Sequence, residues 1–170
     1  RMESKAGEPS GAVLADARAT LFRDPGTPIA NPTGAIPVVT FFDYRCGYCK
    51  KMVPDIRRLR KEDAGIRLVF KDLPILGPDS VIAARAALAS RAQEKYEVFH
   101  FALMEAKGTY TEPRVLGIAK EAGLDVERLQ RDLKDPRIDA QIEANLELAK
   151  KLNIRGTQTM IIGDSFVPGS

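Results

Sequence analysis

The most constraining feature of this 170-residue sequence is a buried-type strand that runs directly into a cysteine pair. Residues 36–42, IPVVTFF, are nearly all apolar and rich in β-branched and aromatic side chains. This composition predicts a central strand that is buried on both faces. Apolar positions from Cys49 to Leu59 then recur at helical spacing. Cys46 is therefore expected at the N-terminus of a helix that follows a central strand.

The cysteine pair itself indicates a redox centre. Cys46 and Cys49 are the only two cysteines, whereas a scaffold of structural disulfides uses more cysteines at wider spacing. At a helix N-terminus, unpaired amides and the macrodipole favour a thiolate over a thiol. We expect Cys46 to be the exposed nucleophile and Cys49 to be the shielded resolving thiol. Gly47 and Tyr48, between them, are expected to tune the redox potential.

Metal and nucleic-acid binding are less favoured by the composition. A zinc site normally takes four Cys or His ligands, and the sequence holds two cysteines and a single histidine, His100. Metal binding by the pair stays open only as a site shared between chains. A net charge of +3 and 6% aromatic residues without Trp indicate no nucleic-acid surface. His100 is expected on a helix face or in the core, and the basic cluster from Lys50 to Lys61 is interpreted as a solvated helix face.

The remaining chain predicts an α/β protein with a large helical insertion. A second strand over 66–70 should pair in parallel with the first, because a helix connects them. Helical periodicity then fills the insertion, with capping residues expected at Asp79 or Ser80, Thr111, Asp125 and Asp135. A hairpin, 159–162 and 165–167, ends the chain. The expected units are a leader and helix (1–27), a first half (28–76), the inserted domain (77–152) and a second half (153–170).

Several segments resemble the DsbA-like thiol–disulfide oxidoreductases of the thioredoxin superfamily. Residues 41–49, FFDYRCGYC, are similar to the active-site segment of that family. Their Cys-Gly-Tyr-Cys centre is similar to those of suppressor-of-copper-sensitivity protein C and of DsbC/DsbG-type proteins. Residues 69–78, VFKDLPILGP, resemble the exit of the family's second strand, and parts of 156–169 resemble its active-site hairpin. Pro54 matches the helix-kinking proline of thioredoxins.

This resemblance implies a thioredoxin fold with an inserted helical domain. It also implies oxidation or isomerisation of disulfides in protein substrates, with Gly47, Tyr48, Thr157 and Gln158 in contact with the substrate. The expected place is the bacterial periplasm, with a membrane redox partner. No signal peptide is visible in the given chain, as in a mature exported protein. No cofactor is implied, since electrons pass through the dithiol itself.

Three departures from the family pattern carry expectations of their own. Gln158 replaces the cis-proline after Thr157, and because a non-proline cis bond costs roughly 2.5–4 kcal/mol, we expect a trans peptide, a shifted loop and altered substrate handling. Thr40 replaces a buried acid that often relays protons to the resolving thiol, whereas Lys71 keeps a basic partner often seen nearby. The family's C-terminal helix is apparently missing before Ser170, which predicts a truncated sequence or a covering element from a neighbouring chain.

Alternative functions also follow from these departures. Gln158 and Thr40 allow a redox-poor thioredoxin-like chaperone or metal-binding scaffold. A kappa-type glutathione transferase shares the fold but would not need Cys49. The amphipathic helix over 13–22 is expected either to form a homo-oligomer, as the family's isomerases do, or to pack on its own domain. A swapped C-terminal element is a second possible basis for a homo-oligomer.

Overall fold

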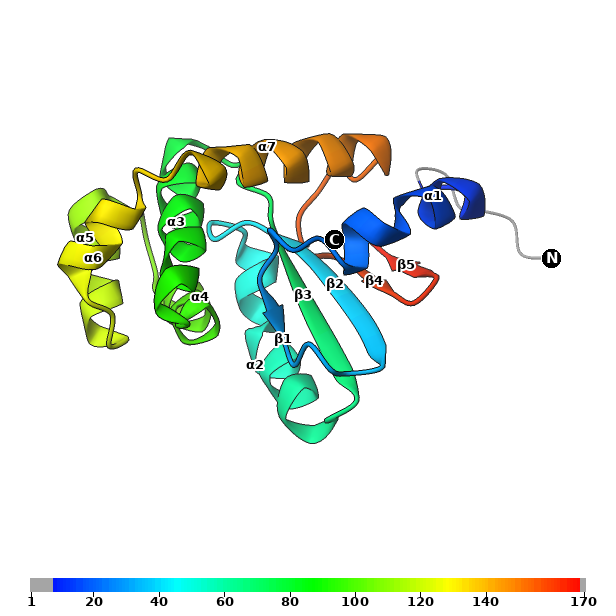
Figure 1. Ribbon diagram of the computed structural model, residues 1–170, viewed down its shortest axis with the longest axis horizontal. Coiled ribbons are helices and arrows are strands. Elements are labelled where there is room, and N and C mark those ends of the chain that lie inside the picture. Colours follow the sequence, from blue (N-terminus) through cyan, green and yellow to red (C-terminus); the bar gives the residue numbers. More distant parts are fainter. Residues whose placement is uncertain (1–7, 169–170) are drawn as a thin grey trace.

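The computed structural model describes residues 8–168 and contains a five-stranded mixed sheet in the order β1-β3-β2-β4-β5 (Figure 1). Only β2 and β3 are parallel, and the other neighbouring pairs are antiparallel. The predicted central strand is confirmed with its expected bounds. Its apolar side chains are buried on both faces of the sheet, as its composition predicts. The strands are β1 (Ile29–Ala30), β2 (Ile36–Phe42), β3 (Ile66–Asp72), β4 (Thr159–Ile162) and β5 (Ser165–Val167).

The helices follow the predicted order, with α3, α4, α5 and α6 gathered at one end of the molecule (Figure 1). The predicted caps at Thr111, Asp125 and Asp135 are confirmed, since each side chain accepts a backbone N–H of its helix. Within the described part of the chain, no helix is both long and apolar enough to cross a lipid bilayer. The bounds are α1 (Gly11–Phe22), α2 (Gly47–Glu62), α3 (Pro78–Ala89), a 3-10 turn (Ser90–Gln93), α4 (Tyr96–Glu105), α5 (Glu112–Glu121), α6 (Val126–Asp132) and α7 (Pro136–Lys151).

The expected cap of α3 is wrong. Neither Asp79 nor Ser80 caps this helix; Gly77 takes the N-cap position without a side-chain bond. The two polar side chains turn instead toward the segment that carries the cysteines. Asp79 forms an ion pair with Arg45 at 3.2 Å, and the Ser80 hydroxyl donates to Asp43 at 2.7 Å. Tertiary partners therefore outweigh the local capping preference that the sequence suggests.

The two faces of the sheet pack against different helices. The face that carries Val38 and Phe42 packs on α2 and the inserted helices. The opposite face, with Val39 and Phe41, packs on α1 and the second half of α7, which runs from the insertion back toward the sheet (Figure 1). Burying apolar area on both faces stabilises the sheet by about 25 cal/mol per Å².

Helix α1 packs on its own domain, through the buried residues Ala17, Leu21 and Phe22. Its apolar side is therefore used within the chain, which supports the second of the two expectations for this helix. On the α2 side of the sheet, three apolar side chains remain more exposed, one at the start of β2 and one on each of β4 and β5. They are Ile36, Ile162 and Val167. A covering element from a neighbouring chain stays a prediction.

Candidate active site

Cys46 caps the active-site helix, as its sequence position predicts. Its side-chain sulfur accepts the backbone N–H of Cys49 at 3.2 Å, and its carbonyl accepts the N–H of Lys50 at 3.1 Å. Cys46 is partly exposed, whereas Cys49 is 1% exposed. Gly47 and Tyr48, between them, are exposed. Cys46 is therefore partly accessible at a helix N-terminus, whereas Cys49 is shielded in the core.

The buried position of Cys49 suppresses its ionisation. Burial raises the pKa of the Cys49 thiol to about 12, and its contact with Cys46 acts in the same direction. The backbone of Asp43 and the side chain of Thr157 act against this increase. Cys49 is therefore a thiol at neutral pH when the pair is reduced. Of the two cysteines, Cys46 is the more accessible one.

Asp43 is a site residue that the sequence reasoning missed. It is 1% exposed, and its carboxylate accepts the N–H groups of Arg45, Ile75 and Leu76 at 2.8–2.9 Å. It also accepts the hydroxyl of Ser80 at 2.7 Å. These bonds tie the start of α2 to the loop between β3 and α3. An Asp directly after a buried strand and two residues before a bonded N–H is typical of an Asx turn, and this signal could have revealed it.

Thr157 lies next to Cys49, and Gln158 follows Thr157 in the sequence. A hydrogen bond from the Thr157 side chain lowers the pKa of the Cys49 thiol. Gln158 is 3% exposed, with a left-handed φ of 58°, and no cis peptide bond occurs in the described residues. Its side-chain amide donates to the Thr40 hydroxyl at 3.1 Å. The expected trans peptide is confirmed, and the two residues that depart from the family pattern are bonded to each other.

The expectation for Lys71 is wrong. Side chains alternate along a strand, so Lys71 points to the face opposite Phe70, toward the α1 and α7 side. Its ammonium donates to the Thr27 hydroxyl at 2.6 Å and pairs with Asp24 at 3.3 Å. Burial lowers the pKa of Lys71, whereas Asp24 acts in the opposite direction. Lys71 therefore serves the opposite face of the sheet and is not a basic partner of the cysteines.

A buried polar layer lies between the sheet and α4. The Tyr44 hydroxyl and His100 Nδ1 are 2.8 Å apart, and the Tyr96 hydroxyl donates to Asp72 at 2.8 Å. Burial lowers the pKa of His100 to about 3 and raises the pKa of Asp72 to about 8. His100 is thus a neutral core histidine, as expected. Aromatic rings surround it at centroid distances of 4.6–5.7 Å.

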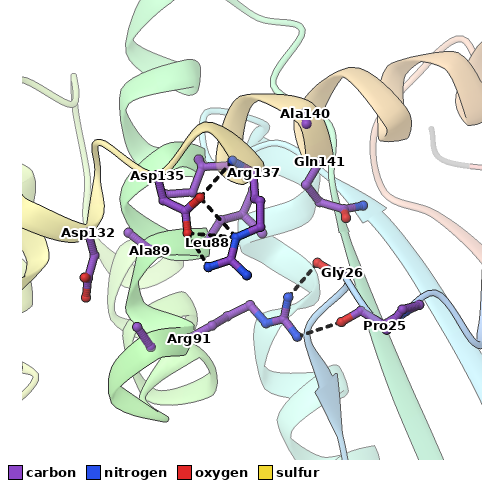
Figure 2. Close-up of a pocket in the computed structure, with 12 residues that line it drawn as sticks. Pro25, Gly26, Leu88, Ala89, Arg91, Asp132, Asp135, Arg137, Ala140 and Gln141 are labelled. Atoms are coloured by element: carbon purple, nitrogen blue, oxygen red, sulfur yellow. Dashed lines mark hydrogen bonds and ion pairs between the residues drawn. The ribbon is translucent and has the colours of Figure 1, made fainter.

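A concave site lies away from the cysteines, between the end of α3, the start of α7 and residues 25–26 (Figure 2). Its volume is about 660 Å³, and neither cysteine lines it. Arg91 donates to the carbonyls of Gly26 and Pro25, and Arg137 pairs with Asp135 at 2.7 Å (Figure 2). Both guanidinium groups are thus already bonded within the chain. Among the described residues, no three His, Cys, Asp or Glu side chains gather in a metal-binding group.

The fold and the cysteine site together define a thioredoxin-type protein with a dithiol at a strand-to-helix junction. A family model described as a DSBA-like thioredoxin domain matches residues 37–170. The chain belongs to this family, and the resemblance noted in the sequence is confirmed.

Solved structures agree with the assignment. A thioredoxin-like oxidoreductase from Silicibacter pomeroyi DSS-3 is 48% identical, with a TM-score of 0.86 over 89% of this chain and 88% of that one. The catalytic domain of Proteus mirabilis ScsC is 26% identical, with a TM-score of 0.84 over 94% and 90% of the two chains. The predicted likeness to suppressor-of-copper-sensitivity protein C is therefore confirmed.

Curated relatives fall into two groups. "Probable disulfide bond formation protein D" of Bacillus anthracis is 29% identical over 140 residues, which are 75% of this chain and 64% of that protein. "Na(+)/H(+) antiporter NhaA 1" of Salinispora arenicola (strain CNS-205) is 30% identical over 129 residues. That match covers 75% of this chain but only 20% of the antiporter. The chain therefore corresponds to one part of that relative.

Proposed function

We propose that Cys46 and Cys49 exchange thiols and disulfides with protein substrates, with Cys46 as the nucleophile and Cys49 as the resolving thiol. One observation carries this proposal. Cys46 is partly exposed at the N-terminus of α2 and accepts the N–H of Cys49, whereas Cys49 is buried behind it. The thiolate is the reactive form of a cysteine, and a helix N-terminus favours it. Exposed Gly47 and Tyr48 would contact the substrate, with Thr157 and Gln158 contributing through their backbone because their side chains are buried.

The pair can carry out both oxidation and isomerisation of substrate disulfides, with electrons and protons balanced in each. In oxidation, a substrate thiolate attacks Cys46 of the Cys46–Cys49 disulfide, and Cys49 leaves and takes a proton. A second substrate thiolate then attacks the mixed disulfide and releases Cys46 as a thiolate, so two electrons pass from substrate to enzyme. In isomerisation, reduced Cys46 attacks a substrate disulfide, a substrate thiolate rearranges, and Cys46 is expelled without net electron transfer.

The state of Cys49 favours isomerisation over rapid net oxidation. A thiol of lower pKa leaves faster from a disulfide, and burial raises the pKa of Cys49 to about 12. Burial acts in this direction also while Cys46 is in a disulfide, and it therefore makes Cys49 a slower leaving group in oxidation and a slower attacker of a mixed disulfide. Isomerisation needs only Cys46 to cycle. A long-lived mixed disulfide gives substrate thiols time to rearrange.

Two assays with ribonuclease test this proposal. Recovery of activity from scrambled ribonuclease measures isomerisation, and recovery from reduced ribonuclease with stoichiometric oxidised enzyme measures oxidation. We expect clear acceleration of the first and weaker acceleration of the second, each relative to glutathione buffer alone. The opposite order would make the protein an oxidase, and no acceleration in either assay would contradict the proposed function.

The cellular setting is proposed from similarity. One structural relative, 27% identical with a TM-score of 0.76, is described as a periplasmic thioredoxin-like protein from Salmonella enterica serovar Typhimurium. We infer a periplasmic location, protein substrates and a membrane redox partner that resets the dithiol. Fractionation of the native host, followed by alkylation of Cys46 in each fraction, tests this location.

A specific observation also supports a second function, as a redox-poor chaperone or metal-binding scaffold. Gln158 is turned inward onto Thr40, so the loop beside the cysteines differs from the family pattern at its substrate-contacting position. Suppression of aggregation by the Cys46→Ser variant, with no activity of the natural protein in either ribonuclease assay, would favour the chaperone. Copper or zinc uptake that depends on both cysteines would favour the scaffold.

A further inference from the structure

Lys50, the residue directly after the cysteine pair, is held by the helical insertion. Its ammonium donates to the carbonyl of Ala106 at 2.7 Å, to the hydroxyl of Tyr110 at 2.6 Å and to the carbonyl of Met104 at 3.3 Å. Its backbone N–H donates to the carbonyl of Cys46. One side chain thus connects the first turn of α2 to the end of α4 and the segment after it.

The partners of this ammonium are neutral. Among residues 8–168, no carboxylate lies within ion-pair distance of Lys50. The ammonium also lies 5.1 Å from the centre of the Tyr110 ring, a contact that favours a cation. Because no bonded partner neutralises it, a partly buried charge of this kind acts electrostatically on other groups nearby.

Lys50 follows Cys49 directly and lies four residues after Cys46, one helical turn away, so its side chain and that of Cys46 share one face of α2. Burial is the largest influence on the pKa of Lys50 and lowers it, and Arg114 acts in the same direction. Negative charge at Cys49, at Asp43 and at Cys46 raises it. Electrostatic coupling is reciprocal, so a positive Lys50 also stabilises negative charge on the sulfurs.

We propose that Lys50 is a positioning residue of the redox site, which fixes the first turn of α2 on the insertion and stabilises the thiolate of the reduced pair. The inference rests on the proposed function of Cys46 and Cys49. Reduction of their disulfide takes two electrons from a thiol reductant and one proton, and yields a thiolate at Cys46 and a thiol at Cys49, with Lys50 protonated throughout. Stabilising this reduced form makes the disulfide more oxidising.

The variants separate the charge of Lys50 from its mechanical tether. Lys50→Gln removes the charge but keeps N–H donors, Lys50→Met removes both, and Lys50→Arg keeps both. Lys51→Gln is the matched control, because Lys51 is an exposed neighbour on the same helix and the same unit of charge is lost. The full chain is equilibrated with glutathione buffers, and the fraction of disulfide is followed by alkylation and mass spectrometry.

We expect Lys50→Gln and Lys50→Met to shift the equilibrium constant about 3- to 10-fold toward the disulfide, because both remove the charge that stabilises the thiolate. A tenfold change corresponds to about 30 mV for a two-electron couple. The pH of half-maximal Cys46 alkylation should rise in both. Lys50→Arg and Lys51→Gln should stay within about twofold of the natural protein, because an arginine keeps the charge and an exposed lysine is screened by solvent.

Each outcome decides the inference. Equal shifts in Lys50→Gln and Lys51→Gln would mean that only net charge matters, and no shift in folded Lys50→Gln would remove the thiolate role. Failure of both neutral variants to fold would leave Lys50 a purely structural tether and would also overturn the inference. If the natural protein does not exchange with glutathione at all, the proposed function itself fails, which is a separate result.

Discussion

Two regions at the end of β2 use polar groups in opposite ways. At the surface, Cys46, Gly47 and Tyr48 are partly or fully exposed, and Cys46 is held chiefly through backbone groups. Beneath them, Asp43 and Tyr44 are each 1% exposed and bonded to other segments of the chain. A reactive sulfur needs access to a partner, whereas a buried polar group needs partners within the protein. We therefore assign the proposed disulfide exchange to the surface region, and the positioning of the cysteine-bearing segment to the buried region.

Substitution of the two cysteines gives the largest expected effect. Cys46→Ser should lower the rate of disulfide exchange by about 1000-fold or more, because a serine hydroxyl is not ionised at neutral pH and a thiolate is the nucleophile. Cys49→Ser should keep the first attack and accumulate a mixed disulfide with a substrate protein. Non-reducing electrophoresis and intact-mass measurement detect the adduct. An inert Cys49→Ser variant in single turnover would reverse the assignment of roles.

The buried region should respond in stability rather than in chemistry. Asp43→Ala removes the acceptor for the N–H groups of Arg45, Ile75 and Leu76 and for the Ser80 hydroxyl. Leaving buried donors without partners costs about 1–3 kcal/mol each, so we expect a loss of about 3–5 kcal/mol in the free energy of unfolding. Urea unfolding at constant pH measures this loss.

An exposed acid on the active-site helix provides the control. Asp55→Ala removes only the pair with Arg58, which lies on the surface of α2, and such pairs contribute about 0.2–1 kcal/mol. A similar loss for Asp43→Ala and Asp55→Ala would show that the buried region is not special. Asp43→Asn should lie between the two, since an amide oxygen still accepts.

Asp72 extends the comparison to pH. Its buried carboxyl has a pKa raised to about 8 from an ordinary 3.8, so between these values the folded state binds more protons than the unfolded state. Stability therefore falls as pH rises through this window, by up to about 1.4 kcal/mol per pH unit. Asp72→Asn should remove the fall and gain about 2–3 kcal/mol relative to the natural protein between pH 5.5 and 7.5.

The opposing behaviour of His100 has to be separated from this effect. Its pKa is lowered to about 3, so below pH 6.5 only the unfolded state takes up the proton, and stability falls as pH falls. Both proteins in the comparison contain His100, and this contribution cancels in their difference. Parallel stability curves for the natural protein and Asp72→Asn would contradict the assignment of Asp72.

The surface region was more predictable from sequence than the buried region, for a physical reason. The strand at 36–42 and the position of Cys46 follow from local periodicity, which a single segment carries. Apart from Arg45, the partners of Asp43 and those of the Lys50 side chain come from the loop between β3 and α3, from α3, and from the end of α4 and the segment after it. No local pattern specifies these distant partners. Lys71 is instructive because strand alternation alone separates it from Phe70. The resemblance to the family placed Lys71 near the cysteines, which lie at the opposite face of the sheet.

Gln158 and Thr40 give the smallest effect and a final test of where the buried region begins. The Gln158 amide donates to the Thr40 hydroxyl at 3.1 Å, and both residues are at most 3% exposed. A hydrogen bond between neutral groups contributes about 0.5–1.5 kcal/mol. A double-mutant cycle of Gln158→Ala and Thr40→Val should therefore give a coupling of about 1 kcal/mol in urea unfolding. Coupling near zero would place Gln158 with the surface region, free to contact substrate, and the loop beside the cysteines would then be set by its backbone alone.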